Sequence, residues 1–387
     1  MKILVVGAGP TGLALAADLY RRDIHCDIVE KDSKRASLSK ALGVQSGVLR
    51  CFDATLGKDF TQRLIDAGRQ VQRANVHIDD HPPITVDLSP IPGPYSFVLI
   101  LEQSQTEELL ESKLNQLGGE VQRGTEVVHI NQHESEVNVR LNDGVEKRYD
   151  YVIGCDGAHS IVRDAMAATF KGGQYEATFS LGDIHVHWSY PMEIRAFIQS
   201  RGMLVFFPFE EDGRYRAIYF IKGDSRTGEL DLDTFQREMR EIADQAPSIS
   251  NPRWMTRFKI HHRMVNNYRN KRLFLAGDAA HIHSPVGGQG MNLGIQDALS
   301  LSNKFSLLAK GIDKLDDYSR ERIRVARAIV STTDRLTSVG LRKDNWFVKF
   351  ARNKILPHIV SKRFIQKRAA YAMSQIAWAD EEIRRYV

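Results

Sequence analysis

The first thirty residues alternate between short apolar runs and an amphipathic stretch. Residues 2–6 (KILVV) form a run of the length and composition of a buried strand. Residues 13–22 (LALAADLYRR) place their apolar side chains on one face of a helix, and a second apolar run, CDIVE, ends at Glu30. The pattern therefore predicts a strand, a turn, a helix and a second strand.

The turn between the first strand and the helix has the spacing GxGxxG, with Gly7, Gly9 and Gly12. Gly7 permits a tight turn, Gly9 lets the backbone approach a pyrophosphate, and Gly12 lets the helix pack close to the sheet. The helix N-terminus presents free N–H groups and a positive dipole to phosphates. Glu30 can accept both hydroxyls of an adenosine ribose and would repel a 2′-phosphate, which predicts tightly bound FAD or NAD rather than NADP.

Further strands are predicted in two groups. Residues 119–153 contain the runs EVQR, EVVHI, VNVRL and KRYDYVIG, with a hairpin turn at Asn142-Asp143-Gly144. Residues 179–222 contain FSLGDIHVHW, EIRAFIQ, MLVFFPF and RYRAIYFI, and they predict a second sheet distinct from the nucleotide-binding unit.

Helices are predicted around these groups. Ser104-x-x-Glu107 matches a capping box and predicts that a helix begins at Ser104. Residues 272–276 (RLFLA) form another buried strand, and a long helical region follows from about Gly290 to the C-terminus.

Composition narrows the class of protein. The chain has 387 residues, of which 42% are hydrophobic and 26% charged, which excludes collagen-like, disulfide-framework and mostly disordered proteins and suits two or three domains. No apolar run is long enough to span a bilayer, and the first strand leaves no room for a signal peptide. Cys26, Cys51 and Cys155 have no metal-ligand spacing, so reduced structural thiols in a cytoplasmic protein are expected.

The net charge of +5 is concentrated near the C-terminus. Residues 342–368 contain nine Lys or Arg and one Asp, a net of +8, so the rest of the chain nets −3. A solvated helical face is the ordinary interpretation, and contact with a membrane surface or a partner is the alternative. No recognised nucleic-acid-binding module accompanies the charge, so nucleic acid is not an expected partner.

Two more motifs follow the glycine turn. Residues 154–160 are GCDGAHS and continue to Arg163, while residues 272–281 are RLFLAGDAAH and continue through PVGGQGMN at 285–292. In this order the three motifs resemble those of the class A flavoprotein aromatic hydroxylases, which have the para-hydroxybenzoate hydroxylase fold. The most similar groups are the phenol and polyketide hydroxylases and the tetracycline-inactivating monooxygenases. The resemblance covers roughly residues 1–330.

The resemblance implies a role for each motif. Asp278 would accept hydrogen bonds from the ribityl hydroxyls of FAD, and residues 285–292 would stabilise negative charge at N1–C2=O of the reduced flavin. Asp156 and Gly157 would serve FAD and a transient NAD(P)H, with Arg163 bracing them. The expected cofactor-binding residues are Gly7, Gly9, Pro10, Thr11, Gly12, Glu30, Lys31, Lys40, Gln103, Asp156, Gly157, Arg163, Gly277, Asp278, Pro285, Gly288, Gln289, Gly290, Met291 and Asn292.

The sequence also departs from the family pattern. Lys40 stands where many relatives carry an arginine, so the charge is kept but the bidentate fork is lost. Ser300 and Asn303 replace residues that are often Asn and Trp, which should affect helix packing more than mechanism. A mostly helical, basic stretch stands where larger relatives have a thioredoxin-like domain, so that domain is not expected.

Catalytic side chains cannot be assigned from the sequence, but there are candidates for the substrate pocket. His185 and His187 share one face of a strand, and either one could bind or deprotonate a phenol or be an ordinary sheet histidine. Arg216 lies where relatives place an arginine near the ring, and surface salt bridging is an equal alternative. His281 and His283 lack a third ligand for a metal, so no metal site is expected.

The expected fold is α/β: a Rossmann-like FAD-binding domain with an inserted β-sheet substrate domain and a C-terminal helical segment. Residues 1–75, 98–177 and 264–335 would form the first, 76–97 and 178–263 the second, and 336–387 the basic helical segment. We expect a monomer or homodimer.

The expected activity is that of an FAD-dependent monooxygenase. NADPH or NADH would reduce the flavin, and a C4a-hydroperoxide would transfer one oxygen atom from O2 to an aromatic or polyketide-like small molecule. One alternative is an FAD-dependent reductase or dehydrogenase of a lipid or isoprenoid. The other is a non-catalytic flavin binder. A halogenase is disfavoured, because the Trp-x-Trp-x-Ile-Pro signature is missing.

Overall fold

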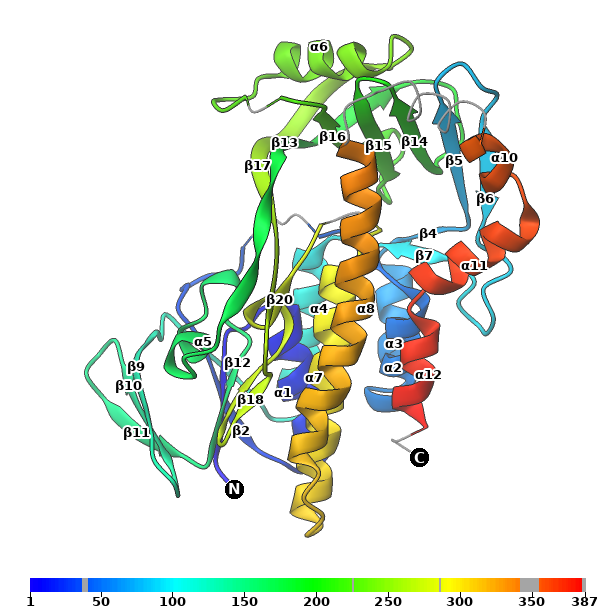
Figure 1. Ribbon diagram of the computed structural model, residues 1–387. Coiled ribbons are helices and arrows are strands. Elements are labelled where there is room, and N and C mark those ends of the chain that lie inside the picture. Colours follow the sequence, from blue (N-terminus) through cyan, green and yellow to red (C-terminus); the bar gives the residue numbers. More distant parts are fainter. Residues whose placement is uncertain (37–40, 225, 285–286, 342–354, 385–387) are drawn as a thin grey trace.

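The nucleotide-binding half of the molecule is built on a six-stranded sheet (Figure 1). The structure is a computed structural model that describes residues 1–36, 41–224, 226–284, 287–341 and 355–384. Five strands run parallel and β18 is antiparallel at one edge. In spatial order they are β18 (Arg269–Asn270), β19 (Leu273–Leu275), β12 (Tyr151–Gly154), β1 (Ile3–Val6), β2 (Cys26–Glu30) and β8 (Val121–Arg123).

The strand–helix–strand unit predicted from residues 2–30 is present. Every residue of β1 is buried, as continuous apolar runs are in parallel sheets covered on both faces. Helix α1 (Pro10–Arg21) packs against α4 (Gln103–Gln116) and α7 (Gly290–Ala309). The other helices of this half are α2 (Ser46–Thr55), α3 (Lys58–Asp66) and α5 (Ile161–Ala165).

The predicted capping box is wrong. Helix α4 has Glu102 at its N-cap, and no side chain caps it. The side-chain amide of Gln103 instead donates to Glu107 Oε1 at 2.8 Å. The predicted pairing of Ser104 with Glu107 therefore gives way to a contact between two residues one helical turn apart.

Two three-stranded sheets flank this half. One has the order β11 (Glu146–Tyr149), β10 (Val137–Leu141), β9 (Val127–Gln132), and its β10–β11 hairpin turns at Gly144 with φ +84° as predicted. The predicted strand KRYDYVIG is divided at Asp150, because β11 and β12 belong to different sheets. The other sheet contains β3 (Gly43–Val44), β7 (Val98–Ile100) and β4 (Arg69–Val71).

The second half is an eight-stranded sheet, as the runs in 179–222 predict. Two eighteen-residue strands, β13 (Phe170–His187) and β17 (Ser248–Val265), extend from it to the nucleotide-binding half (Figure 1). Helix α6 (Leu232–Ile242) packs on this sheet. The remaining strands are β5 (Arg73–Ile78), β6 (Ile84–Asp87), β14 (Ile194–Gln199), β15 (Gly202–Pro208), β16 (Arg214–Ile221) and β20 (His281–Ile282). The expected domain boundaries at 177/178 and 263/264 fall inside β13 and β17.

Four helices complete the described chain. The long α8 (Leu315–Leu341) spans the expected boundary at 335/336, and the following helices are α10 (Leu356–Val360), α11 (Arg363–Met373) and α12 (Ile376–Ile383). The last of these lies beside α2 (Figure 1). No described helix combines the length and apolarity needed to cross a membrane. All three cysteines are buried and free.

Candidate cofactor site

The glycine turn after β1 has the geometry of a phosphate-binding loop. Gly7 has φ +99°, and a Cβ on it would lie 2.5 Å from the carbonyl oxygen of Cys155. A Cβ on Gly12 would lie 2.0 Å from the carbonyl oxygen of Gly7. A Cβ on Gly9, by contrast, would meet no atom within 4 Å. The open space therefore lies at Gly9, in front of helix α1, which begins at Pro10 without a side-chain cap.

Glu30 ends β2 beside this turn. One carboxylate oxygen accepts a hydrogen bond from the backbone N–H of Ala8 at 2.9 Å, and the other accepts from Asp32 N–H at 3.1 Å. These two contacts orient the carboxylate, and an ionised carboxylate has lone pairs left for ribose hydroxyls. Lys31, which follows it, is exposed.

The Asp-Gly motif follows β12 on the neighbouring strand. Asp156 Oδ2 accepts from the N–H of Ile161 at 2.8 Å, while its Oδ1 is buried with no hydrogen-bond partner in the protein. Burial raises the pKa of this carboxyl. The next residue, Gly157, has φ +73° and open space around its Cβ position. The motif thus combines a buried carboxylate, held by the N–H of Ile161, with unobstructed backbone at Gly157.

Arg163 braces the two acidic motifs instead of facing open space. Its guanidinium donates to the carbonyl of Ala158 at 2.9 Å and to that of Ala279 at 3.2 Å, and it stacks 4.2 Å above the ring of Phe170. The residue is buried. Arg163 therefore ties the turn after β12 to the turn after β19.

The Gly-Asp motif forms a short 3₁₀ turn, η2 (Gly277–Ala279), after β19. Gly277 has φ +62°, and its Cβ position is 2.6 Å from Thr11 Oγ1, which brings this turn against the start of α1. Asp278 is exposed although residues 273–277 and 279–281 are buried. The surrounding protein nevertheless raises the pKa of its carboxyl by desolvation. Asp278 is thus the exposed residue of an otherwise buried turn.

A buried cluster of Asp297, His281 and Arg322 contacts this turn, and the sequence analysis did not predict it. Asp297 Oδ2 accepts from Gly277 N–H at 3.1 Å and lies 2.7 Å from His281 Nε2, while Oδ1 accepts from Arg322 Nε at 2.6 Å. Burial alone would raise the pKa of Asp297, but Arg322 and His281 outweigh it and hold the pKa below its usual range. The signal that could have found it is an aspartate among the apolar residues of α7.

The PVGGQGMN motif leads into α7. Pro285 lies outside the described residues, and α7 begins at Gly290 without a side-chain cap. Asn292 is fully buried: its Oδ1 accepts from Gln45 N–H at 2.7 Å and its Nδ2 donates to the carbonyls of Gly43 and Gly288. Asn292 therefore shapes the loop from inside, and the uncapped N–H groups of α7 are left for a ligand.

The other expected residues of this half are placed differently. Gln103 is engaged with Glu107, whose pKa is raised by burial. Gln289 is buried, and Met291 is partly buried against the core. Lys40 lies outside the described residues.

Two of the three pocket candidates on the eight-stranded sheet, Arg216 and His187, have polar partners in the protein, whereas His185 Nδ1 is buried with no hydrogen-bond partner. Arg216 is fully buried and forms a bidentate pair with Asp183, with both N–O distances 2.7 Å. Trp254 Nε1 donates to the same carboxylate at 2.7 Å. His187 is exposed, with Nε2 2.7 Å from Ser250 Oγ, and its ring lies 5.1 Å from that of His185. Among the described residues, no cluster of three or more His, Cys, Asp or Glu could hold a metal ion.

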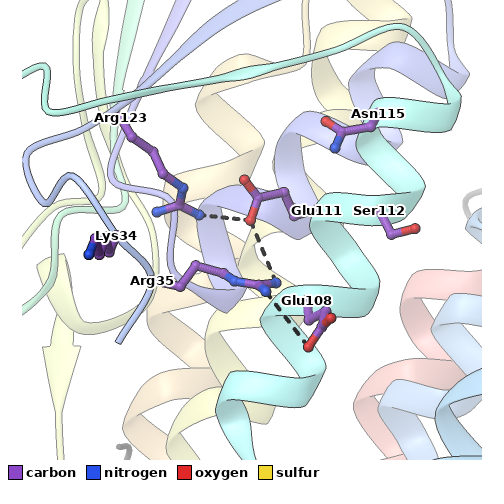
Figure 2. A pocket seen from close by; sticks show the side chains of 7 residues that line it. All are labelled: Lys34, Arg35, Glu108, Glu111, Ser112, Asn115 and Arg123. Atoms are coloured by element: carbon purple, nitrogen blue, oxygen red, sulfur yellow. Dashed lines mark hydrogen bonds and ion pairs between the residues drawn. The ribbon is translucent and has the colours of Figure 1, made fainter. Parts of the chain in front are cut away.

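A surface recess of about 490 Å³ is lined by residues of the segment after β2, of α4 and of β8. Its lining residues are Lys34, Arg35, Glu108, Glu111, Ser112, Asn115 and Arg123 (Figure 2). Arg123, on its wall, is the strand neighbour of Glu30. Arg123 pairs with Glu111 at 2.7 Å, and Arg35 lies 3.7 Å from Glu108 and 3.8 Å from Glu111 (Figure 2). The recess is therefore an ion-paired hollow at the outer edge of the predicted adenosine site.

These features together suit FAD. The open Gly9 turn, the oriented Glu30, the unobstructed backbone at Gly157, the accessible Asp278 and the uncapped start of α7 supply donors and acceptors for a dinucleotide and its ring system. The fold and the site thus define a flavoprotein of Rossmann-like architecture.

Comparison with known proteins gives the family. Residues 1–333 match the model of the FAD binding domain family, so the chain belongs to this family. It is 33% identical over 344 residues to a rifampicin monooxygenase from Streptomyces venezuelae, covering 86% of this chain and 70% of that protein. It is 30% identical to a pentachlorophenol 4-monooxygenase from Sphingobium chlorophenolicum, covering 86% and 63%.

Solved structures of aromatic hydroxylases have the same fold. An anhydrotetracycline hydroxylase from Streptomyces rimosus superimposes with a TM-score of 0.80 and 26% identity, covering 97% of this chain and 76% of that one. The protein is an FAD-dependent monooxygenase.

Proposed function

We propose that this protein hydroxylates an electron-rich aromatic or polyketide-like small molecule, with NADH or NADPH as reductant and O2 as oxygen source. One observation carries the proposal: motifs far apart in sequence meet, since a Cβ on Gly277 would lie 2.6 Å from Thr11 Oγ1 and a Cβ on Gly7 2.5 Å from the carbonyl oxygen of Cys155. The similarity to monooxygenases named for rifampicin and pentachlorophenol supports the substrate class.

The residues of the chain divide the work along the cofactor. Gly9 and the start of α1 would hold the pyrophosphate, Glu30 the adenosine ribose, and Asp278 the ribityl chain. The first N–H groups of α7 would stabilise negative charge on the reduced ring. FAD, when bound, accepts a hydride from NAD(P)H and activates O2. The overall reaction converts substrate, O2, NAD(P)H and a proton into hydroxylated product, water and NAD(P)+.

This assignment requires few acid–base side chains, because the cofactor supplies the oxygen-transfer chemistry. No acid–base step is therefore proposed for Arg216, His185 or His187. The protein's contribution is to orient the flavin, support charge at its ring and exclude water. Water exclusion matters because it suppresses unproductive loss of reduced oxygen as hydrogen peroxide.

The test is the rate of NADH and NADPH oxidation by FAD-loaded protein, with and without a panel of phenols and polyketide aromatics. Stimulation by one ligand class, with oxygen uptake and a hydroxylated product, is the expected result. Oxidation coupled to a saturated product without oxygen uptake would instead identify a reductase. FAD binding without NAD(P)H oxidation under any ligand would identify a non-catalytic flavin binder.

The surface of α11 supports a second proposal, peripheral binding to anionic membranes. Residues 345–379 contain no Asp or Glu. Phe364 and Tyr371 are 64% and 41% exposed, next to exposed basic side chains of the same helix. Aromatic and cationic side chains on one helix suit an interfacial contact with anionic lipid. The basic residues are Lys362, Arg363, Lys367 and Arg368. The part of the basic segment at 342–354 lies outside the described residues.

Cosedimentation with vesicles at low salt tests this surface. Binding to phosphatidylglycerol-containing vesicles, its absence with phosphatidylcholine alone, and its loss in a Lys367→Glu/Arg368→Glu variant are expected. Equal sedimentation of wild type and variant, or none with either vesicle, would discard the membrane proposal. The monooxygenase assay above is independent of this result.

A further inference from the structure

The junction between α11 and α12 is part of the core, although it lies in the segment expected to be a basic helical tail. Ser374, Gln375 and Ile376 are 1%, 1% and 0% exposed. The backbone N–H of Gly47 in α2 donates to the carbonyl of Ser374 at 2.8 Å. A Cβ on Gly47 would lie 2.7 Å from the carbonyl oxygen of Gln375, so the two backbones touch with no room for a side chain.

The side chain of Gln375 uses both of its polar atoms on the α7 segment. Its Nε2 donates to Gln289 Oε1 at 2.6 Å, and its Oε1 accepts from Gln296 Nε2 at 2.8 Å. In return, Gln289 Nε2 donates to the carbonyl of Met373 at 3.0 Å. Three buried amides therefore join the C-terminal helices to the helix that begins at the predicted flavin ring.

Gln289 of this network, together with Gln45 and Asn292, holds the Gly287–Gly288 loop in one orientation. The carbonyl of Gly287 accepts from Gln289 Nε2 at 2.8 Å and from Gln45 Nε2 at 3.0 Å, and the carbonyl of Gly288 accepts from Asn292 Nδ2 at 2.7 Å. In a trans peptide the C=O and the following N–H point in opposite directions. With these carbonyls directed into the protein, the N–H groups of Gly288 and Gln289 point away from the network.

Gln375 adopts this position against its backbone preference. Its φ is +57°, in the left-handed region that side chains other than glycine and asparagine seldom occupy. Such a conformation persists only where surrounding contacts hold it. The contacts that hold it are the amides of the flavin loop and the backbone of α2.

We infer that Gln375 is a positioning residue for the flavin. Through Gln289 it holds the Gly287–Gly290 turn so that N–H groups face N1–C2=O of the ring, and through Gln296 it is fixed to α7. It thereby makes the C-terminal helices part of the cofactor site. This inference rests on the proposed role of residues 287–292 at the ring. It predicts that a change remote from the nucleotide motifs alters the electronic properties of bound FAD.

The experiment compares four variants by two measurements on FAD-loaded protein: the FAD dissociation constant, from flavin fluorescence, and the reduction potential, from equilibration with a reference dye. Gln375→Ala removes the amide, and Gln375→Asn keeps an amide in a residue that tolerates the left-handed region. Gly47→Ala displaces the junction while Gln375 itself is retained. Asp380→Asn is the matched control. Asp380 lies on α12, next to the junction, and the substitution breaks its 2.6 Å ion pair with Arg50 of α2.

Gln375→Ala is expected to raise the FAD dissociation constant about tenfold, the effect of losing a buried hydrogen-bonded anchor. It should also make the potential more negative, because the reduced anionic ring loses stabilisation. Gly47→Ala should move both quantities in the same direction, Gln375→Asn should partly restore them, and Asp380→Asn should change neither.

If Gln375→Ala matches Asp380→Asn in both measurements, the inference is overturned, even where both variants lower the melting temperature. A merely structural role would lower the melting temperature and leave the potential unmoved. The proposed hydroxylation fails separately, because it is judged by oxygen uptake and product from wild-type protein. Neither measurement on bound FAD depends on that outcome.

Discussion

The two halves of the molecule place polar side chains in opposite ways. In the nucleotide-binding half, Gly9 and Gly157 have open space around their Cβ positions, and the carboxylate of Asp278 is exposed after the end of β19. In the eight-stranded sheet, Arg216 and Asp183 form a bidentate pair deep inside the fold, with Trp254 donating to the same carboxylate and Arg216 also donating to the carbonyl of Ala41. The first half is prepared for a ligand, while the conspicuous charges of the second hold the sheet together.

This difference shows that residue type alone does not distinguish a binding group from a structural one. Arg216 and Asp278 are both charged residues that the resemblance to the family singles out as candidates for the ligand site. One is buried with both acceptor oxygens of its partner engaged, and the other is exposed among buried neighbours. The number of hydrogen bonds already made within the protein separates the two cases.

The largest expected effect is on FAD affinity, at Asp278 in the nucleotide-binding half. Asp278→Ala should weaken FAD binding about 100-fold, because charged hydrogen bonds contribute about 1.5–3 kcal/mol each and the ribityl chain offers more than one hydroxyl. The measurement is flavin retained through purification and the dissociation constant on reconstitution. His187→Ala serves as control. An Asp278→Ala protein that purifies fully yellow would sink the Gly-Asp assignment.

On the sheet side, Arg216→Met should cost about 3–5 kcal/mol of unfolding free energy, because it leaves Asp183 as an unpaired buried charge. The double variant Arg216→Met/Asp183→Asn should recover part of this loss. Urea unfolding of both proteins measures it. If the Arg216→Met protein keeps its stability but binds substrate more weakly, then Arg216 is a substrate-binding residue. That result would contradict its assignment as a structural residue of the sheet.

A pH effect is expected at the junction between the halves. His283 is partly buried beside His281, and desolvation lowers its pKa from 6.5 to about 4. Between about pH 4 and pH 6.5, His283 is therefore protonated in the unfolded chain and neutral in the folded chain. The free energy of unfolding consequently falls as the pH drops from about 6.5 to about 4. The loss reaches up to about 3 kcal/mol.

Urea unfolding across pH 4–7 checks this, with His283→Gln as the comparison because it cannot titrate. The difference in unfolding free energy between the wild type and the variant should shift in favour of the variant as the pH falls. A difference that does not vary with pH would contradict the buried, neutral state of His283. Asp297, with a lowered pKa, contributes stability above its unfolded pKa near 4 and loses it only at lower pH.

The smallest effect is expected at His187. His187→Ala removes an exposed contact with Ser250 and should change stability by less than about 0.5 kcal/mol. The KM for a stimulating aromatic ligand should stay unchanged. A large rise in KM at unchanged stability would instead identify His187 as a substrate-binding residue.

Much of the fold and part of the site could be read from local pattern. The unit from Ile3 to Glu30, the hairpin at Gly144 and the strands of 179–222 follow from periodicity and turn chemistry, which act over a few residues. The capping box at Ser104 was wrong, since a short motif is only one of several ways to satisfy a helix start.

The sequence by itself determined where two backbone segments come into close contact, because only glycine allows the turn at Gly7 and the contact at Gly12. Only the tertiary structure decided which polar side chains remain available. The pairing of Arg216 with Asp183, of Asp297 with Arg322 and of Gln375 with Gln289 joins residues 25 to 86 positions apart. Hydrogen bonds between such distant segments depend on packing, which no local spacing records.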